Sequence, residues 1–248
     1  MAAGSERVCV VGGGPAGLAL ARSFKAHGVA FDIYERHSDV GGLWDQSNPG
    51  SPVYNSAHFI SSKTQSHYTD FPMPDAYPDY PSNKQIHNYM QSFADAFGLR
   101  EHIAFNTGVK MATRDGEGWR VTLDNGETKD YSALVCATGT NWHPSMPTYP
   151  GTFTGEMRHA STYRAMDEFK GKRVLIIGAG NSGCDIACDA AQSADKAFIS
   201  MRRGYHFLPK HLFGIPADVF AHDGPQLPMW LTQRIFGVVL RILNGDVT

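Results

Sequence analysis

Residues 8–17 read Val8-Cys9-Val10-Val11-Gly12-Gly13-Gly14-Pro15-Ala16-Gly17, an apolar run followed at once by the pattern GxGxxG. Residues 174–183 repeat the pattern as Val174-Leu175-Ile176-Ile177-Gly178-Ala179-Gly180-Asn181-Ser182-Gly183. Each copy predicts a strand, a tight turn and a helix. The first glycine forms the turn, the second lets the backbone approach a pyrophosphate, and the third lets the helix pack on the strand. Because the phosphate then lies at the helix N-terminus, we expect the chain to hold two dinucleotides.

Residues of opposite charge follow the two glycine patterns at nearly the same distance. Glu35 lies 23 residues after Gly12 and ends a short apolar stretch. Arg202 lies 24 residues after Gly178, also behind an apolar stretch, and is followed by Arg203. An acidic residue at this place accepts hydrogen bonds from ribose hydroxyls, whereas a pair of guanidinium groups suits a 2′-phosphate. The sequence therefore predicts that the two sites bind different dinucleotides.

The composition is that of a globular protein from a reducing compartment. Of the 248 residues, 42% are hydrophobic and 19% are charged, which suffices for one large domain or two modest ones. The formal net charge of −2 gives no basic field that would attract nucleic acid or anionic lipid. The four cysteines lie in or beside apolar segments, without the spacing of a disulfide framework or a zinc site. We therefore expect a cytoplasmic protein without a metal.

Neither end of the chain has the pattern of a targeting or membrane segment. The run Met1-Ala2-Ala3-Gly4-Ser5-Glu6-Arg7 leads straight into the first strand, which leaves no room for a cleavable leader. Residues 229–243 are apolar but contain Arg234 and Arg241, so they are too short and too charged to span a membrane. As a helix, they have one broad apolar face that needs a partner.

The helices of the first part are marked by their ends. Pro15 at the start and Gly28 past the end bound a helix over residues 15–26. Ser82 opens a capping box with Gln85, and apolar residues recur at helical spacing behind it. We expect the apolar stripe of this second helix to lie in the core.

Short strands follow the second helix. Pairs such as Asn125-Gly126 interrupt alternating runs between residues 103 and 134, which predicts a small antiparallel meander. A buried strand at 133–136 then stops at Ala137-Thr138-Gly139. Residues 71–81 are rich in proline and aromatic side chains, and we expect an ordered surface loop without a helix there. The predicted fold class is α/β, with two Rossmann-like dinucleotide-binding domains and the meander in the first of them.

The order of these elements resembles the flavoprotein oxidoreductases that bind two dinucleotides, with FAD first and a nicotinamide second. Residues 153–163 read Phe153-Thr154-Gly155-Glu156-Met157-Arg158-His159-Ala160-Ser161-Thr162-Tyr163 and match FxGxxxHxxxY. This motif resembles the fingerprint of the flavin-containing monooxygenases and their Baeyer–Villiger relatives. The stretches at 61–63, 70–74 and 180–187 resemble the same family. The resemblance covers nearly the whole chain, as an N-terminal portion of such an enzyme.

The resemblance implies an FAD-binding domain at residues 1–165. The pyrophosphate would lie on the first glycine loop and its helix, Glu35 would bind the adenosine ribose, and the segment around Trp44 would lie beside the flavin. Trp44 fits an ordinary core aromatic residue equally well. The residues implied to bind FAD are Gly12, Gly14, Pro15, Ala16, Gly17, Glu35, Gly42, Leu43, Trp44 and Ser61.

The resemblance also implies an NADPH-binding domain at residues 166–248. His159, in the connection between the domains, would serve cofactor binding and domain movement rather than proton transfer. Only 70 residues follow Gly178, so the C-terminal part of this fold is expected to be absent from the chain. The residues implied to bind NADPH are Gly178, Gly180, Asn181, Ser182 and Gly183 at the pyrophosphate, with Arg202 and Arg203 at the 2′-phosphate.

The reaction implied by the resemblance is an oxygenation. NADPH would pass a hydride to FAD, and the reduced flavin would combine with dioxygen to form a C4a-hydroperoxide. That species would deliver one oxygen atom to a small soft nucleophile, at an amine nitrogen or a thioether sulfur. No side-chain nucleophile is required, which agrees with a sequence that shows no convincing triad, paired carboxylates or metal cluster. The sequence leaves the oligomeric state open.

One position departs from the family pattern. Ile60 stands where well-known members carry an asparagine close to the reactive edge of the flavin. A branched aliphatic side chain cannot donate a hydrogen bond there, so Ser61 and Asn55 are the nearby polar candidates for a catalytic role. An uncoupled NADPH oxidase that releases hydrogen peroxide is therefore an alternative function.

Further alternatives stay open. A Baeyer–Villiger monooxygenase acting on ketones is the closest of them. A truncated nucleotide-binding module without oxygenation activity is favoured by Ile60 and by the short C-terminal part. A disulfide reductase similar to thioredoxin reductase is less favoured, because its redox pair should have the spacing CxxC. Cys184 and Cys188 instead lie four residues apart on one helical face, where we expect small buried thiols to pack.

Overall fold

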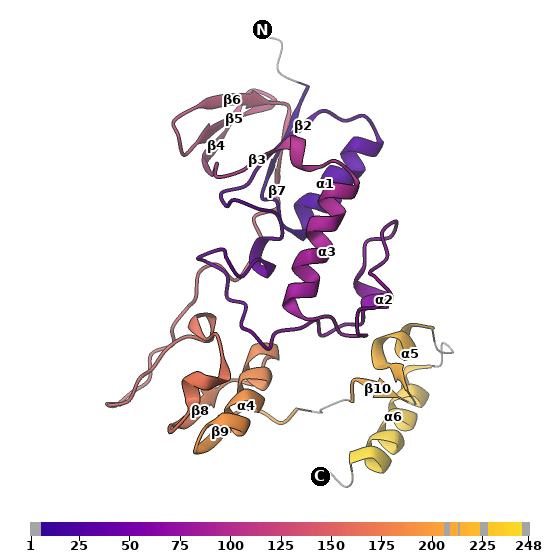
Figure 1. Ribbon diagram of the computed structural model, residues 1–248, viewed down its shortest axis with the longest axis vertical. Coiled ribbons are helices and arrows are strands. Elements are labelled where there is room, and N and C mark those ends of the chain that lie inside the picture. Colours follow the sequence, from indigo (N-terminus) through magenta and orange to yellow (C-terminus); the bar gives the residue numbers. More distant parts are fainter. Residues whose placement is uncertain (1–5, 206–208, 213, 224–227, 245–248) are drawn as a thin grey trace.

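The protein has two α/β halves that are joined by a long connection (Figure 1). The structure is a computed structural model that describes residues 6–205, 209–212, 214–223 and 228–244. Part of the N-terminal run and parts of the second predicted domain lie outside these residues. We call residues 6–136 the first half, residues 137–165 the connection, and the described residues from 166 onward the second half. The expected α/β fold class is confirmed.

The first half is built on a parallel sheet of four strands in the order β3-β2-β1-β7. The helix α1 connects β1 to β2, as predicted. One face of the sheet buries Val10 and Ile33 against Leu18 of α1, and all three side chains are 0% exposed. The bounds are β1 (Val8–Val11), α1 (Pro15–Ala26), β2 (Phe31–Tyr34), β3 (Ile103–Ala104) and β7 (Ala133–Cys136).

The helix α3 (Asn83–Ala96) shares the core of α1 through its apolar stripe. Its predicted capping box is confirmed, because Ser82 N donates to Gln85 Oε1 at 2.9 Å and Gln85 N donates to Ser82 Oγ at 3.4 Å. Residues 71–81 contain no helix, as expected. The remaining short helical turns are η1 (Gly42–Trp44), α2 (Lys63–Ser66), η2 (Arg100–His102), η3 (Ala160–Thr162) and η4 (Met166–Phe169).

The other face of the sheet lies beneath the predicted meander. Cys9 and Tyr34 on this face pack against Val121 and Leu123. The antiparallel strands of the meander are β4 (Val109–Asp115), β5 (Gly118–Leu123) and β6 (Thr128–Tyr131).

Two expectations about the strands are corrected. Residues 103–104 pair with β2 in the parallel sheet and take no part in the meander, because the chain re-enters beside β2 after α3. The strand β7 is only half-buried and its last residue, Cys136, is exposed. The physical reason is that β7 is an edge strand of the sheet.

The second half repeats the strand–helix–strand unit with β8 (Arg173–Ile177), α4 (Asn181–Ser193) and β9 (Lys196–Ser200). The strands are parallel, and one face of the pair packs on α4. The other face carries Leu175, Ile177 and Phe198, which are 59%, 55% and 48% exposed. The equivalent face of the first half is covered by the meander. Among the described residues, the second unit lacks such a covering layer.

Residues 209–212 and 214–223 turn back and lie against the first half (Figure 1). They form β10 (His211–Leu212), β11 (Ile215–Pro216) and α5 (Ala217–Asp223). Asp218 Oδ2 accepts a hydrogen bond from Ser62 N at 2.6 Å, and Asp79 Oδ2 lies 2.9 Å from a ring nitrogen of His211. The predicted domain boundary at residue 165 stays a prediction.

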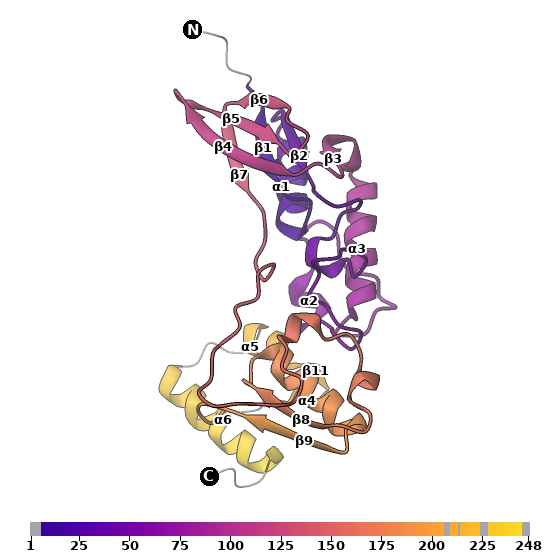
Figure 2. The same ribbon diagram turned by 90° about the vertical axis from the view of Figure 1, so that its left-hand side faces the viewer.

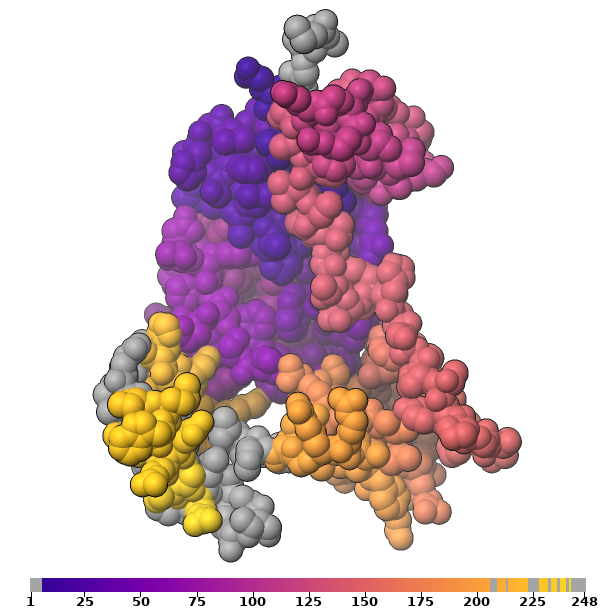
Figure 3. Space-filling model, turned by 180° about the vertical axis from the view of Figure 1, so that it is seen from behind, coloured from indigo at the N-terminus to yellow at the C-terminus, as the bar shows by residue number. Residues whose placement is uncertain are grey.

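The C-terminal helix α6 (Met229–Asn244) is confirmed, and its exposed apolar residues include Met229, Trp230, Ile235 and Val238. Figure 2 shows α6 at the end of the molecule opposite the N-terminus. In Figure 3, α5 and α6 form a mass that is separate from β8, β9 and α4 below the first half. None of the helices described by the structure is long and apolar enough to cross a bilayer.

All four cysteines are free thiols. Burial raises the pKa of Cys9 to about 12, so this thiol stays protonated. The expectation that Cys184 and Cys188 pack as buried thiols is wrong for Cys188, which is exposed, while Cys184 is half-buried. The reason is that α4 turns Ile186 and Ala190 inward, which places Cys188 on the opposite side of the helix.

Asp32 ties the sheet to the meander through its charge. Arg7 Nη2 donates to Asp32 Oδ1 at 2.5 Å, and Tyr131 OH donates to Asp32 Oδ2 at 3.0 Å. Burial alone would raise the pKa of Asp32, but the hydrogen bonds from Arg7 and Tyr131 outweigh it and hold that pKa below its ordinary value. A carboxylate whose pKa is lower in the folded state than in the unfolded state stabilises the fold. This stabilisation is complete above the unfolded-state pKa of about 4, and it is lost as the pH falls through the folded-state pKa.

We therefore expect Asp32→Asn to lower the free energy of unfolding by about 1–2 kcal/mol at neutral pH. The difference from the unmodified protein should shrink as the pH is lowered from 4 toward 2. Urea denaturation across this range measures it. Asp75→Asn is the control, because Asp75 is exposed and its carboxylate has no polar partner among the described residues. An equal loss for Asp32→Asn at every pH would contradict the electrostatic origin.

Candidate functional site

The two glycine loops have the same geometry. Gly12 and Gly178 adopt φ angles of 109° and 103°, which favour glycine. A Cβ on Gly17 would lie 2.0 Å from the carbonyl oxygen of Gly12, and a Cβ on Gly183 would lie 2.2 Å from that of Gly178. Each loop is therefore closed by an approach that only glycine allows, as the sequence predicts.

The helix N-termini behind both loops are open to an anion. Gly14 precedes α1 and Gly180 precedes α4, and neither helix has a side-chain cap. A Cβ on Gly180 would meet no described atom within 4 Å. Pro15 begins α1 and needs no amide partner, while Asn181 begins α4. Unpaired N–H groups at a helix start bind phosphate, so both loops fit a pyrophosphate group.

Glu35 braces the first glycine loop. Glu35 is 5% exposed, and its carboxylate accepts from Gly13 N at 2.7 Å through Oε2 and from His37 N at 2.9 Å through Oε1. A carboxylate has four acceptor sites, so these two bonds leave capacity for ribose hydroxyls. The structure thus brings Glu35 to the loop and adds a role in holding the loop that the sequence did not reveal.

The predicted flavin-side residues follow the loop in space. A Cβ on Gly14 would lie 3.6 Å from the Cα of Gly42, so η1 sits on the first glycine loop. Leu43 and Trp44 pack against the core cluster that joins the two halves. The Trp44 ring meets Phe59 edge-to-face, with the ring centres 5.1 Å apart. Trp44 is partly buried at the edge of the core, and both its interpretation as a core aromatic and its contact with flavin stay predictions.

A polar groove borders Trp44. It has a volume of about 580 Å³, and its lining also includes Asp45, Asn83 and Lys84. Asn83 is 1% exposed, and its Oδ1 has no hydrogen-bond partner among the described residues. Of the residues predicted to lie beside the flavin, Trp44 therefore adjoins open space.

The candidates for a catalytic role, Asn55 and Ser61, lie on either side of Ile60 in one segment of the chain. Ile60 follows Phe59 directly and is 64% exposed. The Ser61 hydroxyl lies 2.6 Å from the Ser66 hydroxyl within the same turn. Asn55 uses its backbone N–H for Arg164 O at 2.8 Å. Asn55 and Ile60 are thus both exposed and Ser61 is half-buried, and the Ile60 side chain has no polar atom to offer.

The second glycine loop lies beside the predicted arginine pair. Gly178 N donates to Ser200 O at 2.9 Å, which places the loop at the end of β9, two residues before Arg202. Arg202 and Arg203 are exposed, and the Arg203 guanidinium lies 5.7 Å from the centre of the Tyr205 ring. Ser182, in the first turn of α4, is also exposed. The predicted NADPH residues are therefore neighbours with accessible side chains.

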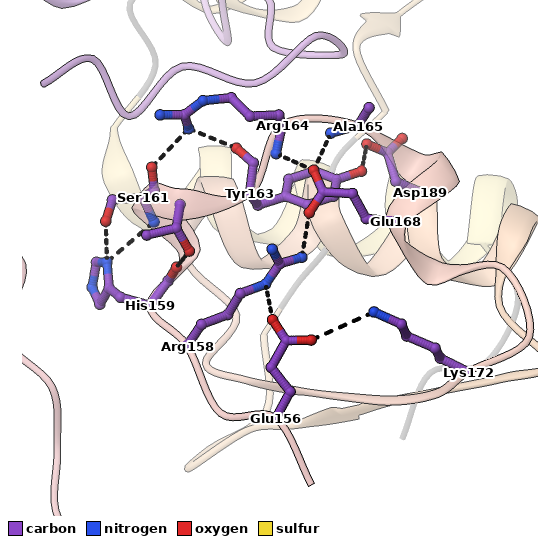
Figure 4. A network of polar contacts seen from close by, with 11 residues as sticks. Glu156, Arg158, His159, Ser161, Tyr163, Arg164, Ala165, Glu168, Lys172 and Asp189 are labelled. Atoms are coloured by element: carbon purple, nitrogen blue, oxygen red, sulfur yellow. Dashed lines mark hydrogen bonds and ion pairs between the residues drawn. The ribbon is translucent and has the colours of Figure 1, made fainter. Parts of the chain in front are cut away.

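The motif FxGxxxHxxxY forms the joint between the halves (Figure 4). His159 Nδ1 accepts from Ser161 N at 3.1 Å, so the imidazole is bound within its own turn. Tyr163 is 2% exposed and donates to Asp189 Oδ2 of α4 at 2.8 Å. Arg164 Nη2 donates to a backbone carbonyl of the first half at 2.9 Å. Cofactor binding by His159 stays a prediction, and the tyrosine of the motif makes the long-range contact.

Sequence reasoning missed four residues of this joint. Tyr54 OH donates to Asp185 Oδ2 at 2.7 Å, and Ser56 Oγ donates to Asp189 Oδ2 at 2.5 Å. Two acids four residues apart on an otherwise uncharged helix were the available signal, because such a pair lies on one helical face. Nothing in the sequence pointed to their hydroxyl partners.

Replacing Glu35 with Gln tests the bracing of the first loop. The glutamine amide has only one oxygen, so its NH₂ group would face the N–H of either Gly13 or His37, and that N–H would lose its acceptor. We expect Glu35→Gln to lower the free energy of unfolding of the cofactor-free protein by about 1–3 kcal/mol, measured by urea denaturation. Glu117→Gln, in an exposed hairpin turn, should change it by less than about 0.5 kcal/mol. Equal values for both variants would refute the bracing role.

Comparison with known proteins shows the family of this chain. The family model "Flavin-binding monooxygenase-like" matches residues 5–235. Flavin-containing monooxygenase 5 of Cavia porcellus is 36% identical over an alignment of 233 residues, and the match covers 86% of this chain and 43% of that enzyme. The chain thus spans less than half the length of this relative.

Two solved structures share the fold. Flavin-containing monooxygenase from Stenotrophomonas maltophilia has a TM-score of 0.75 and 28% identity, over 94% of this chain and 68% of that chain. OTEMO in complex with FAD and NADP has a TM-score of 0.66 and 28% identity, over 81% of this chain and 39% of that chain. Because the family model matches nearly the whole sequence, the chain belongs to the flavin-binding monooxygenase-like family.

Proposed function

We propose that the protein is an FAD- and NADPH-dependent monooxygenase that oxygenates a small soft nucleophile, at an amine nitrogen or a thioether sulfur. The observation that carries the proposal is the pair of equivalent glycine loops in different charge settings. One loop lies beside the buried Glu35, and the other lies beside the exposed Arg202 and Arg203. Membership in the flavin-binding monooxygenase-like family supports this reaction class.

In this proposal, residues 1–165 bind FAD. The open N-terminus of α1 receives the pyrophosphate, and Glu35 offers its remaining acceptor sites to the ribose. Leu43 and Trp44 bound the flavin side. Bound FAD would accept a hydride from the nicotinamide and activate dioxygen. The chain's own part is to hold the two cofactors, orient them and exclude water.

Residues 166–248 bind NADPH in the same proposal. The open N-terminus of α4 receives the pyrophosphate. Arg202 and Arg203 follow β9 and offer planar guanidinium groups, which pair with a phosphate through two parallel hydrogen bonds. The other partners are dioxygen and the small nucleophile, and the proposed location is cytoplasmic.

The absorbance of the bound flavin tests the function. Under anaerobic conditions, we expect NADPH to bleach the flavin of the purified loaded protein. Arg202→Ala or Arg203→Ala should weaken the binding of NADPH about ten- to a hundredfold, because a hydrogen bond to a charged group contributes about 1.5–3 kcal/mol. The affinity for NADH should stay within about twofold. Arg173→Ala is the control, since Arg173 is exposed at the other end of β8. The proposed function is refuted if the protein binds no flavin, or if NADPH does not bleach the bound flavin.

Ile60 favours a second candidate function, an uncoupled NADPH oxidase, because its exposed side chain has no hydrogen-bonding atom. We expect Ile60→Asn to lower the hydrogen peroxide formed per NADPH several-fold in the presence of a thioether, with a matching rise in sulfoxide. Ile60→Leu, which adds no polar atom, should leave the ratio unchanged. An unchanged ratio in Ile60→Asn would mean that this position has no part in coupling.

A further inference from the structure

Asp189 is a buried acid whose described polar partners are both hydroxyl groups. It lies in the third turn of α4 and is 8% exposed. Its Oδ2 accepts from Tyr163 OH at 2.8 Å and from Ser56 Oγ at 2.5 Å. Hydrogen bonds to an ionised carboxylate are shorter and stronger than bonds between neutral groups. The two bonds therefore hold Asp189 at a defined place although no cation pairs with it among the described residues.

The partners of Asp189 come from different parts of the chain. Ser56 belongs to the first half, Tyr163 belongs to the connection, and Asp189 belongs to the second half. One turn earlier on α4, Asp185 Oδ2 accepts from Tyr54 OH of the first half at 2.7 Å. The two acids thus meet three hydroxyls along one face of α4, and both halves of the protein contribute to the contact.

The two phenols remain donors over a wide pH range. Burial and the hydrogen bond to Asp185 raise the pKa of Tyr54, and burial and the hydrogen bond to Asp189 raise the pKa of Tyr163. The Tyr163 ring also stacks on Phe169, with the ring centres 4.9 Å apart and the planes 6° from parallel. Each hydroxyl is therefore presented to its carboxylate by a ring that packing already holds.

This contact lies close to the second glycine loop. Asp189 is eight residues from Asn181, the first residue of α4, or about 12 Å along the helix axis. The side chain of Ser182, in the first turn, opposes the rise in the pKa of Tyr54. Since a helix moves as a rigid rod over this length, fixing Asp189 against the first half also fixes the start of α4.

The contact around these bonds is apolar, and apolar packing alone does not fix the orientation of one half relative to the other. The cluster at the joint contains Val53, Ile186 and Ala190 in addition to the aromatic rings. Apolar packing is non-directional, so it opposes separation of the halves more than a small rotation. The hydroxyl–carboxylate bonds are directional and supply that missing constraint.

We propose that Asp189 is a positioning residue that sets the orientation of the second glycine loop, and hence of a bound nicotinamide, relative to the flavin half. The inference rests on the proposed function, because an orientation matters only if hydride passes between the two cofactors. Hydride transfer depends steeply on geometry, whereas nicotinamide affinity depends on the loop and the arginine pair. Loss of the Asp189 carboxylate should therefore slow hydride transfer without weakening the binding of NADPH.

The test combines a structural and a kinetic measurement on Asp189→Asn. The first is hydrogen exchange of the Asn55 amide, which donates to Arg164 O beside the joint at 2.8 Å. We expect at least tenfold faster exchange at Asn55 and unchanged exchange in β1. The second is anaerobic flavin reduction, where the rate at saturating NADPH should fall at least tenfold while the dissociation constant of NADPH changes less than threefold.

Three variants make the result specific. Tyr163→Phe removes one hydroxyl and keeps the ring, so it should reproduce part of both effects. Its combination with Asp189→Asn should be less than additive, because both changes remove the same hydrogen bond. Asp195→Asn is the matched control, since Asp195 is an exposed acid just past α4.

The outcomes separate this inference from the proposed function. Unchanged exchange at Asn55 in Asp189→Asn, or additive effects in the double variant, would overturn the inference. Faster exchange with an unaltered rate of reduction would also overturn it and leave Asp189 a purely structural role. A raised dissociation constant with an unaltered rate would overturn it in favour of a binding role. If NADPH does not reduce the flavin of the unmodified protein, the proposed function fails and the positioning role with it, whatever the exchange result.

Discussion

The close approach of two glycines in each loop is the contact on which both halves depend. The Cα of Gly17 lies over the carbonyl oxygen of Gly12, and that of Gly183 lies over Gly178, at distances that leave no room for a Cβ. This approach lets the helix start directly above the end of the strand, with its N–H groups unpaired. The anion site and the packing of helix on sheet are therefore one structural feature, and no side chain larger than hydrogen can replace either glycine.

The same unit lies in two different environments. In the first half, the sheet face opposite α1 is covered by the meander, and the bonds among Arg7, Asp32 and Tyr131 tie the two layers together. In the second half, the equivalent face leaves Leu175 and Phe198 exposed. Burial of such side chains contributes about 25 cal/mol per Å² of apolar surface. The described second unit therefore lacks a source of stability that the first unit has, and its contacts with the first half carry more weight.

Those contacts combine apolar packing with a few directional bonds. The aromatic rings at the joint bury surface, while the carboxylates of Asp185 and Asp189 receive hydroxyls from the first half and the connection. The proposed transfer of a hydride between two bound cofactors requires both properties, because the halves must stay together and must also face each other at a defined angle. The terminal Tyr163 of the motif FxGxxxHxxxY supplies one of these bonds.

The sequence by itself determined the two strand–helix–strand units, the bounds of α1 and the capping box at Ser82, because each depends on residues within a few positions of one another. It also placed Glu35 and the arginine pair at their loops, since parallel strands end at a common edge. Only the tertiary structure decided that residues 103–104 join the parallel sheet and that Cys188 faces outward. It alone brought Ser56 to Asp189, 133 residues apart in the chain. Local sequence patterns cannot specify such a contact, because it depends on how the two halves pack against each other.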